Sequence, residues 1–268
     1  MANFRTVFEK HLEGSRKIGS LLDAGVVPEL KPGEFESDSA REVATTYIRI
    51  MNLFRSIFTL GEVEHYEAIV TLAGNLFELF IDMNLLTGDE TGEMHRRRRE
   101  FLDIQKFRAA HRMVAFHDES GGRTVLDVEE QRRFKENIGG IEQIRKRIAE
   151  VWGPDNSGRS SYPVHWSGRK CTRVISHEMG LEYEELYIEV YSVLSWMISN
   201  GMSGEFSEDV KYEICSWCHG VSQLAVLEAT KLCAGLSKTV EKLVWLPGAI
   251  GTLRRTPGTA LTADFFDA

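Results

Sequence analysis

Apolar residues recur at intervals of three and four along nearly the whole chain, and this periodicity limits the folds that it can adopt. The strict alternation that is typical of strands is scarce. Glycines and prolines separate the periodic segments. The pattern predicts an all-α protein, a multi-helix bundle of roughly eight helices without a sheet. The predicted helices cover residues 4–22, 39–60, 63–86, 93–117, 126–152, 167–180, 182–200 and 208–245.

Residues at several segment ends are those that begin or end helices. Either Asp38 or Ser39 can cap the second helix, and Ser39 forms a capping box with Glu42. The Gly139-Gly140 pair predicts a kink inside 126–152. The stretch 153–168 is rich in Gly, Ser and Pro and has no apolar period, so it predicts a long loop. We therefore expect one helical domain over 1–247, with this loop inside it, and a loosely packed C-terminal tail over 248–268.

Composition excludes several classes of protein. The 268 residues are 43% apolar and carry a net charge of −8, which is too apolar and too balanced for a disordered chain. Four cysteines are too few for a disulfide scaffold. The N-terminus lacks the apolar run of a signal peptide, and polar residues interrupt the apolar stretch 68–86. We expect a cytoplasmic protein with reduced thiols and no membrane partner.

The segment Cys215-Ser216-Trp217-Cys218-His219 matches the C-x-x-C-H attachment pattern of c-type haem. It lies inside a long helical pattern, where buried structural cysteines are the commoner explanation. A zinc site would need a fourth ligand from Cys171, Cys233 or His177, and no spacing predicts one. We therefore expect no cofactor and no metal.

A basic stretch covers residues 95–112, with seven Lys and Arg against two acidic residues, a net charge of +5. In an acidic chain such a stretch is a candidate phosphate-binding surface, although a solvated helix face is the simpler explanation. A second candidate is the predicted helix start at Ser167, where helix N-terminal N–H groups favour an anion. An ordinary helix cap is its alternative. The candidate phosphate-binding residues are Arg96, Arg97, Arg98, Arg99, Ser167, Arg169, Lys170 and Arg173.

Arg112 and His117 form an R-x4-H pattern, which ribonucleases of the HEPN group (higher eukaryotes and prokaryotes nucleotide-binding) use for catalysis. Five helical positions turn by about 500°, so the two side chains point ~140° apart on a continuous helix. They would converge only where the helix ends between them, or where a partner chain completes the site. Glu78 and Asp82 lie one turn apart in an otherwise apolar predicted helix. They can form a structural polar cluster, or they can belong to an active site together with His165.

Four segments occur in the order of a known family: Leu72 to Glu78, Phe101 to Lys106, Trp166-Ser167-Gly168, and Leu186 to Ser195 with Tyr187 and Tyr191. This order resembles a bacterial all-helical family that is known only as a domain of unknown function, with HEPN-like features. The resemblance implies an all-helical fold. The residues of this chain that match positions in the family's motifs are Glu78, Asp103, Lys106, Trp166, Tyr187, Tyr191 and Ser195. Their roles in the family are not established. Gly74 replaces the family's Arg, and Ser199-Asn200 replaces its His, so the resemblance does not carry over an Arg–His pair for ribonuclease-like chemistry.

The leading hypothesis is a bacterial HEPN-like protein that binds or cleaves RNA, or another phosphate-rich ligand, in a defence or toxin setting. In a cleaving enzyme, His117, His165 or Glu78 would be the general base and Arg112 would stabilise the phosphorane. The alternative is a non-enzymatic helical interaction or oligomerisation protein, for instance a homodimer. The candidate catalytic residues are Glu78, Asp103, Lys106, Arg112, His117 and His165.

Overall fold

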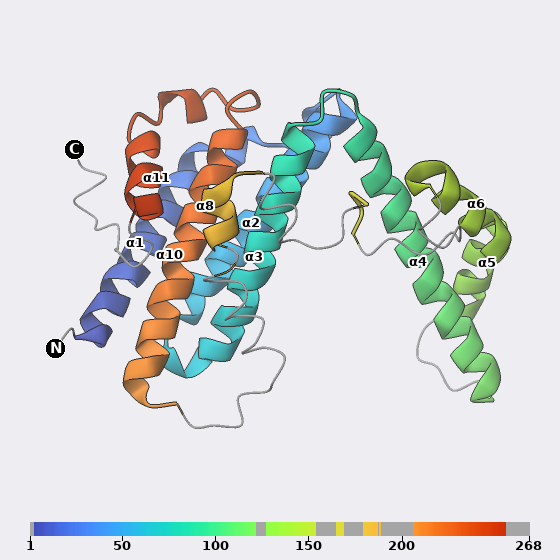
Figure 1. The fold of residues 1–268 in the computed structure, drawn as a ribbon, viewed down its shortest axis with the longest axis horizontal. Coiled ribbons are helices and arrows are strands. Elements are labelled where there is room, and N and C mark those ends of the chain that lie inside the picture. The colour runs from blue at the N-terminus through green and yellow to red at the C-terminus, as the bar shows by residue number, and fades with distance from the viewer. Residues whose placement is uncertain are drawn as a thin grey trace. The chain divides into compact units, whose positions relative to one another are not determined.

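The computed structural model describes residues 3–121, 127–153, 165–168, 179–186, 188 and 206–255. Within these residues the protein is all-α, as the sequence predicts: 82% helical, with nine α-helices, eight of them at least seven residues long, and no strand (Figure 1). The helices are α1 Phe4–Gly25, α2 Asp38–Leu60, α3 Tyr66–Thr87, α4 Glu93–Glu119, α5 Val128–Ile138, α6 Gly140–Trp152, α8 Leu181–Leu186, α10 Glu208–Leu232 and α11 Leu246–Arg255. Short 3-10 turns occupy Val27–Glu29, Pro32–Glu34, Val63–His65 and Val240–Lys242.

The chain divides into two compact units. The first unit comprises Met1–Gly88 with Ile175–Ala268, and the second unit comprises Asp89–Val174. The expectation of a single domain over 1–247 stays a prediction.

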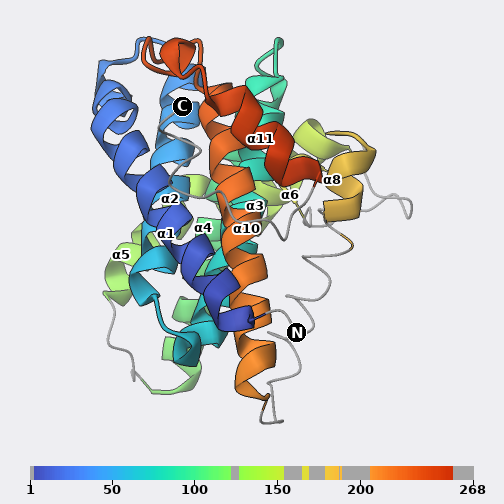
Figure 2. The ribbon, with the colours of Figure 1, turned by 90° about the vertical axis from the view of Figure 1, so that its left-hand side faces the viewer.

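Helix α10 is the centre of the first unit. It packs against α1, α2, α3 and α11 (Figure 2). Apart from the half-buried Trp217, every residue from Ile214 to Thr230 is buried, which is the pattern of a helix surrounded on all sides. Aromatic side chains of α2 and α3 supply much of the surrounding core, and the largest fully buried ones are Tyr47, Phe54, Phe77 and Phe80.

The apolar character of α3 has a simple structural basis. By length and composition alone, Val63–Thr87 would qualify as a membrane-spanning helix, the single such segment among the described residues. A core helix passes the same test, and more than half of its most apolar stretch is buried within the protein.

The second unit has a smaller core of its own. Ile104 and Phe107 on α4 pack with Ile144 and Ile148 on α6, and all four are at most 1% exposed. Phe134 of α5 and Trp152 of α6 pack against this cluster. The predicted spacing of three and four residues along 93–117 thus produces a buried stripe on α4.

Several helix ends differ from the sequence prediction. The cap of α2 is Ser37 and neither Asp38 nor Ser39, since the Ser37 hydroxyl accepts a hydrogen bond from the backbone of Ala40 at 3.3 Å. The predicted kink in 126–152 is a complete break. Gly139 there has a φ of +86°, a left-handed backbone that ends α5 and precedes α6.

The prediction of one helix over 208–245 is wrong in its C-terminal third. Helix α10 ends at Leu232, and the following turns are held by the Glu29 carboxylate. This carboxylate accepts hydrogen bonds from the hydroxyls of Ser237 at 2.6 Å and Thr239 at 2.5 Å. These bonds lower the pKa of Glu29 to about 2, with that of Ser237 the largest cause.

The predicted loose tail also begins too early. Residues 248–255 belong to α11, whose Ala249 and Leu253 are fully buried. Burial of this apolar face outweighs the helix-stopping tendency of Pro247, which is tolerated in the first turn. Residues 256–268 lie outside the described part of the chain.

Candidate functional site

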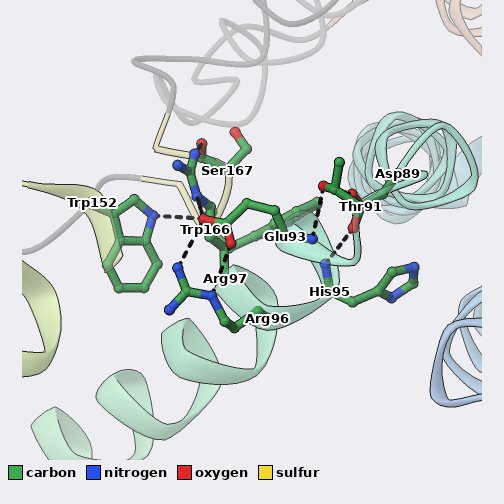
Figure 3. A network of polar contacts seen from close by, with 9 residues as sticks. All are labelled: Asp89, Thr91, Glu93, His95, Arg96, Arg97, Trp152, Trp166 and Ser167. Carbon is green, nitrogen blue, oxygen red and sulfur yellow. Dashed lines mark hydrogen bonds and ion pairs between the residues drawn. The ribbon is translucent and has the colours of Figure 1, made fainter. Parts of the chain in front are cut away.

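The Trp166-Ser167-Gly168 turn, which the sequence singles out, is anchored to two helices of the second unit. The indole Nε1 of Trp152 on α6 donates a hydrogen bond to the carbonyl oxygen of Trp166 at 2.9 Å. The guanidinium Nη1 of Arg97 on α4 donates to the carbonyl oxygen of Ser167 at 3.0 Å (Figure 3). Trp166 and Ser167 are themselves buried. The turn is therefore an integral part of the unit's fold.

Gly168 is required by the conformation of this turn. Its φ is +79°, and a Cβ atom at this position would lie 2.8 Å from Cδ1 of Trp152. Any other residue at this position would destabilise the turn in two ways, because left-handed backbone is unfavourable for residues with a Cβ atom and because that atom would clash with Trp152.

We expect Gly168→Ala to lower the stability of the second unit by more than the ~1–2 kcal/mol of the backbone cost alone. Gly92→Ala is the matched control, because Gly92 has a left-handed backbone with a φ of +75° and a Cβ atom there would have no neighbouring atom within 4 Å. Urea unfolding of both variants checks this. An equal loss in the two variants would show that the Trp152 contact relaxes without cost.

The start of α4 already pairs part of the arginine run. The Glu93 carboxylate accepts hydrogen bonds from Nε of Arg96 and from Nε of Arg97, both at 2.9 Å. The bond from Arg96 is the largest cause of the lowered pKa of Glu93. Arg98 and Arg99 also interact with groups of the protein. The four consecutive arginines thus do not form one open cationic run.

The Ser167 hydroxyl is engaged as well. It lies 2.8 Å from Nδ1 of His165, and the Ser167 backbone N–H also points at this nitrogen, at 3.2 Å. Because a backbone N–H can only donate, Nδ1 of His165 is the acceptor and the ring proton lies on Nε2. The neighbouring candidates Arg169, Lys170 and Arg173 lie outside the described residues, as do Tyr187, Tyr191 and Ser195.

The R-x4-H pair lies on one uninterrupted helix. Helix α4 continues to Glu119, so Arg112 and His117 point ~140° apart and the helix does not end between them. Of the two conditions for their convergence, only completion by a partner chain stays open.

The remaining catalytic candidates divide between the units. Glu78 lies half-buried on α3 of the first unit, whereas Asp103, Lys106 and His165 belong to the second. The Asp103 carboxylate accepts a hydrogen bond from Nη2 of Arg147 at 3.2 Å, beside the ion pair between Arg147 and Glu100. Asp103 therefore has a structural role in joining α4 to α6.

One face of α4 combines exposed cations with exposed apolar side chains. We name this the α4 face and define it as Leu102, Lys106, Ala109, Arg112 and Phe116, which fall within about 120° of the helix circumference. All five are exposed, Leu102 by 48% and Phe116 by 59%. Within the described part of the chain, neither Lys106 nor Arg112 makes an ion pair.

The two units differ in net charge. The second unit contains 18 Lys and Arg against 14 Asp and Glu, a charge of +4. The first unit contains 14 Lys and Arg against 26 Asp and Glu, a charge of −12. An anionic ligand is therefore attracted to the unit that carries the α4 face.

A buried polar cluster between α1 and α10 is absent from the sequence predictions. Nε2 of Gln223 donates to the carbonyl oxygen of His11 at 2.8 Å and to the Ser15 hydroxyl at 2.9 Å. The Ser15 hydroxyl in turn lies 2.9 Å from Nδ1 of His219. All four residues are fully buried, and burial is the main cause that lowers the pKa of His219 to about 3. The sequence does contain a signal for this cluster, because His11 and Ser15 on α1, and His219 and Gln223 on α10, are each four residues apart on an otherwise apolar helix face.

The C-x-x-C-H segment belongs to this interior. Cys215 and Cys218 are buried, and desolvation raises the pKa of the Cys215 thiol to about 12 and that of Cys218 well above its usual range. Thiols in this state are poor nucleophiles and poor ligands. In the part of the chain that the structure describes, no three His, Cys, Asp or Glu side chains are grouped to hold a metal ion. Cys171 and His177 lie outside that part.

The chain matches no family model, no curated protein and no solved structure. It is an all-helical protein without a recognised family.

Proposed function

We propose that this protein is a HEPN-like helical protein that binds RNA, or another phosphate-rich ligand, through the α4 face. The observation that carries the proposal is the pair of exposed cations Lys106 and Arg112, which make no ion pair within the described part of the chain. They lie at the two edges of the α4 face, about 120° apart around the helix. Phosphate binding draws its free energy largely from cations that release counterions. Cations that already have a carboxylate partner, such as Arg96 and Arg97, contribute less.

Binding is better supported than cleavage. A general base and a phosphorane-stabilising cation must both reach the same phosphate. Arg112 and His117 diverge on one helix, and Asp103 is paired with Arg147. A non-cleaving RNA-binding protein also fits the defence or toxin setting of the leading hypothesis.

We expect Lys106→Gln/Arg112→Gln to weaken RNA binding at 50 mM salt by about tenfold or more. If both cations contact single-stranded phosphates, the slope of log affinity against log salt concentration becomes shallower by about 1.4. Fluorescence anisotropy with labelled RNA over a salt series measures both quantities.

The matched control is Arg145→Gln/Lys146→Gln on α6, which removes the same charge from exposed positions, 59% and 68% exposed, in the same unit. This control should keep most of the affinity. Equal loss in the two double variants would mean that only net charge matters, and unchanged binding of Lys106→Gln/Arg112→Gln would refute the proposed site. A denaturing gel of the same mixtures reports any cleavage.

A second candidate function is protein interaction through the same face. Leu102, Ala109 and Phe116 are seven residues apart, the spacing of a helix-pairing seam, and Leu102 and Phe116 are exposed. For this function, sedimentation should show a concentration-dependent dimer that Leu102→Ser/Phe116→Ser abolishes. A protein that stays monomeric at all concentrations tested would exclude self-association as its function.

A further inference from the structure

Phe116 gives the α4 face a feature that phosphate binding alone does not use. Its side chain is 59% exposed, whereas Phe107, the other phenylalanine on the later half of α4, is 1% exposed. Among the described aromatic side chains, Phe116 has no ring neighbour. A single exposed phenylalanine is ordinary on a protein surface. Phe116, however, lies on the same helix face as the exposed cations Arg112 and Lys106, and this combination suggests a ligand that contacts all three side chains.

The three side chains follow one another along the helix axis. Lys106 and Arg112 are separated by a rise of about 9 Å, and Arg112 and Phe116 by about 6 Å. Arg112 and Phe116 are also four residues apart, so they are neighbours on the helix surface. Around the helix, Lys106 and Arg112 lie about 120° apart, with Phe116 between them. A polymer that crosses the α4 face obliquely would therefore meet two cations and an aromatic side chain.

The two forms of RNA present different groups to such a surface. A double helix shows phosphates and 2′-hydroxyls, while its bases are stacked inside and give a phenyl ring no partner. Single-stranded RNA offers the same phosphates together with unstacked bases. Stacking of a base on an aromatic side chain is tolerant of sequence and contributes substantially to affinity.

We infer that the ligand of the α4 face is single-stranded RNA, with a base stacked on Phe116 and flanking phosphates on Arg112 and Lys106. This inference rests on the proposed function. It adds the strandedness of the ligand and a contact that does not depend on charge.

The test compares a labelled single-stranded 16-nucleotide RNA with the corresponding duplex, using Phe116→Ala and Phe116→Tyr. Phe116→Ala should weaken binding of the single strand by about 5- to 150-fold, as expected for the loss of one stacked base. It should leave duplex binding unchanged within twofold. Phe116→Tyr keeps the ring and should keep the affinity. Because Phe116 is exposed, these variants should unfold at the temperature of the unmodified protein.

The outcomes separate this inference from the proposed function. If Phe116→Ala leaves single-strand binding intact while Lys106→Gln/Arg112→Gln still weakens it, the stacking contact is refuted and the phosphate site stands. If Phe116→Ala weakens the duplex as much as the single strand, the strandedness is refuted. If neither RNA binds at 50 mM salt, the proposed function itself fails.

Discussion

Lowering the pH from 7 to 4.5 is expected to destabilise this protein by about 2–3 kcal/mol through His219 alone. Its pKa in the fold is about 3, against 6.5 for an exposed histidine. Between these values the unfolded imidazole takes up a proton and the buried imidazole does not. Stability therefore rises with pH from about 3 to 6.5, is complete above 6.5, and is lost as the pH falls below it. Burial is the main cause, and the nearby His11 and Arg16 disfavour a further positive charge.

The measurement is urea unfolding at pH 7 and at pH 4.5. His219→Gln should remove most of this destabilisation of about 2–3 kcal/mol, although it lowers stability at pH 7 by disturbing the bond to Ser15. His65→Gln is the control, because His65 is half exposed and lies in the same unit. A His219→Gln variant with the same pH dependence as the unmodified protein would show that His219 does not carry the effect.

The helices could be predicted from the sequence because their determinants are local. Apolar spacing, the glycine at 61 and the Gly139-Gly140 pair lie within a few residues of the elements that they define. The end of α10 could not be predicted in this way. It depends on Glu29, a carboxylate more than 200 positions from its partners Ser237 and Thr239.

The same distinction holds for the candidate site. The pairing of Glu93 with Arg96 and Arg97 follows from i, i+3 and i, i+4 spacing and could have been predicted from the basic stretch. The bond from Arg97 to the Ser167 carbonyl joins positions 70 residues apart, and the bonds of Gln223 join α10 to α1. Such contacts depend on which helices pack together, and the local spacing of residues in one sequence does not reveal that packing.

We expect Phe107→Ala to destabilise the second unit by about 3–5 kcal/mol while leaving the first unit largely intact. The Phe107 side chain is 1% exposed and packs with Ile104, Ile144 and Ile148, all from α4 and α6. Its removal leaves a cavity in a core to which the first unit contributes none of the four central side chains. Hydrogen exchange resolved by peptide should show faster exchange in α4, α5 and α6 and unchanged exchange in α10.

Phe54→Ala is the matched variant in the first unit, where Phe54 is fully buried on α2. It should accelerate exchange in α10 and spare α4 to α6. The comparison also tests the single domain over 1–247 that the sequence predicts. One cooperative domain requires each variant to accelerate exchange in both units equally, because all protected amides would then open through the same global unfolding. Separate units require each variant to affect only its own helices. In that case the α4 face, the proposed RNA-binding surface, can be destabilised without loss of the first unit's core.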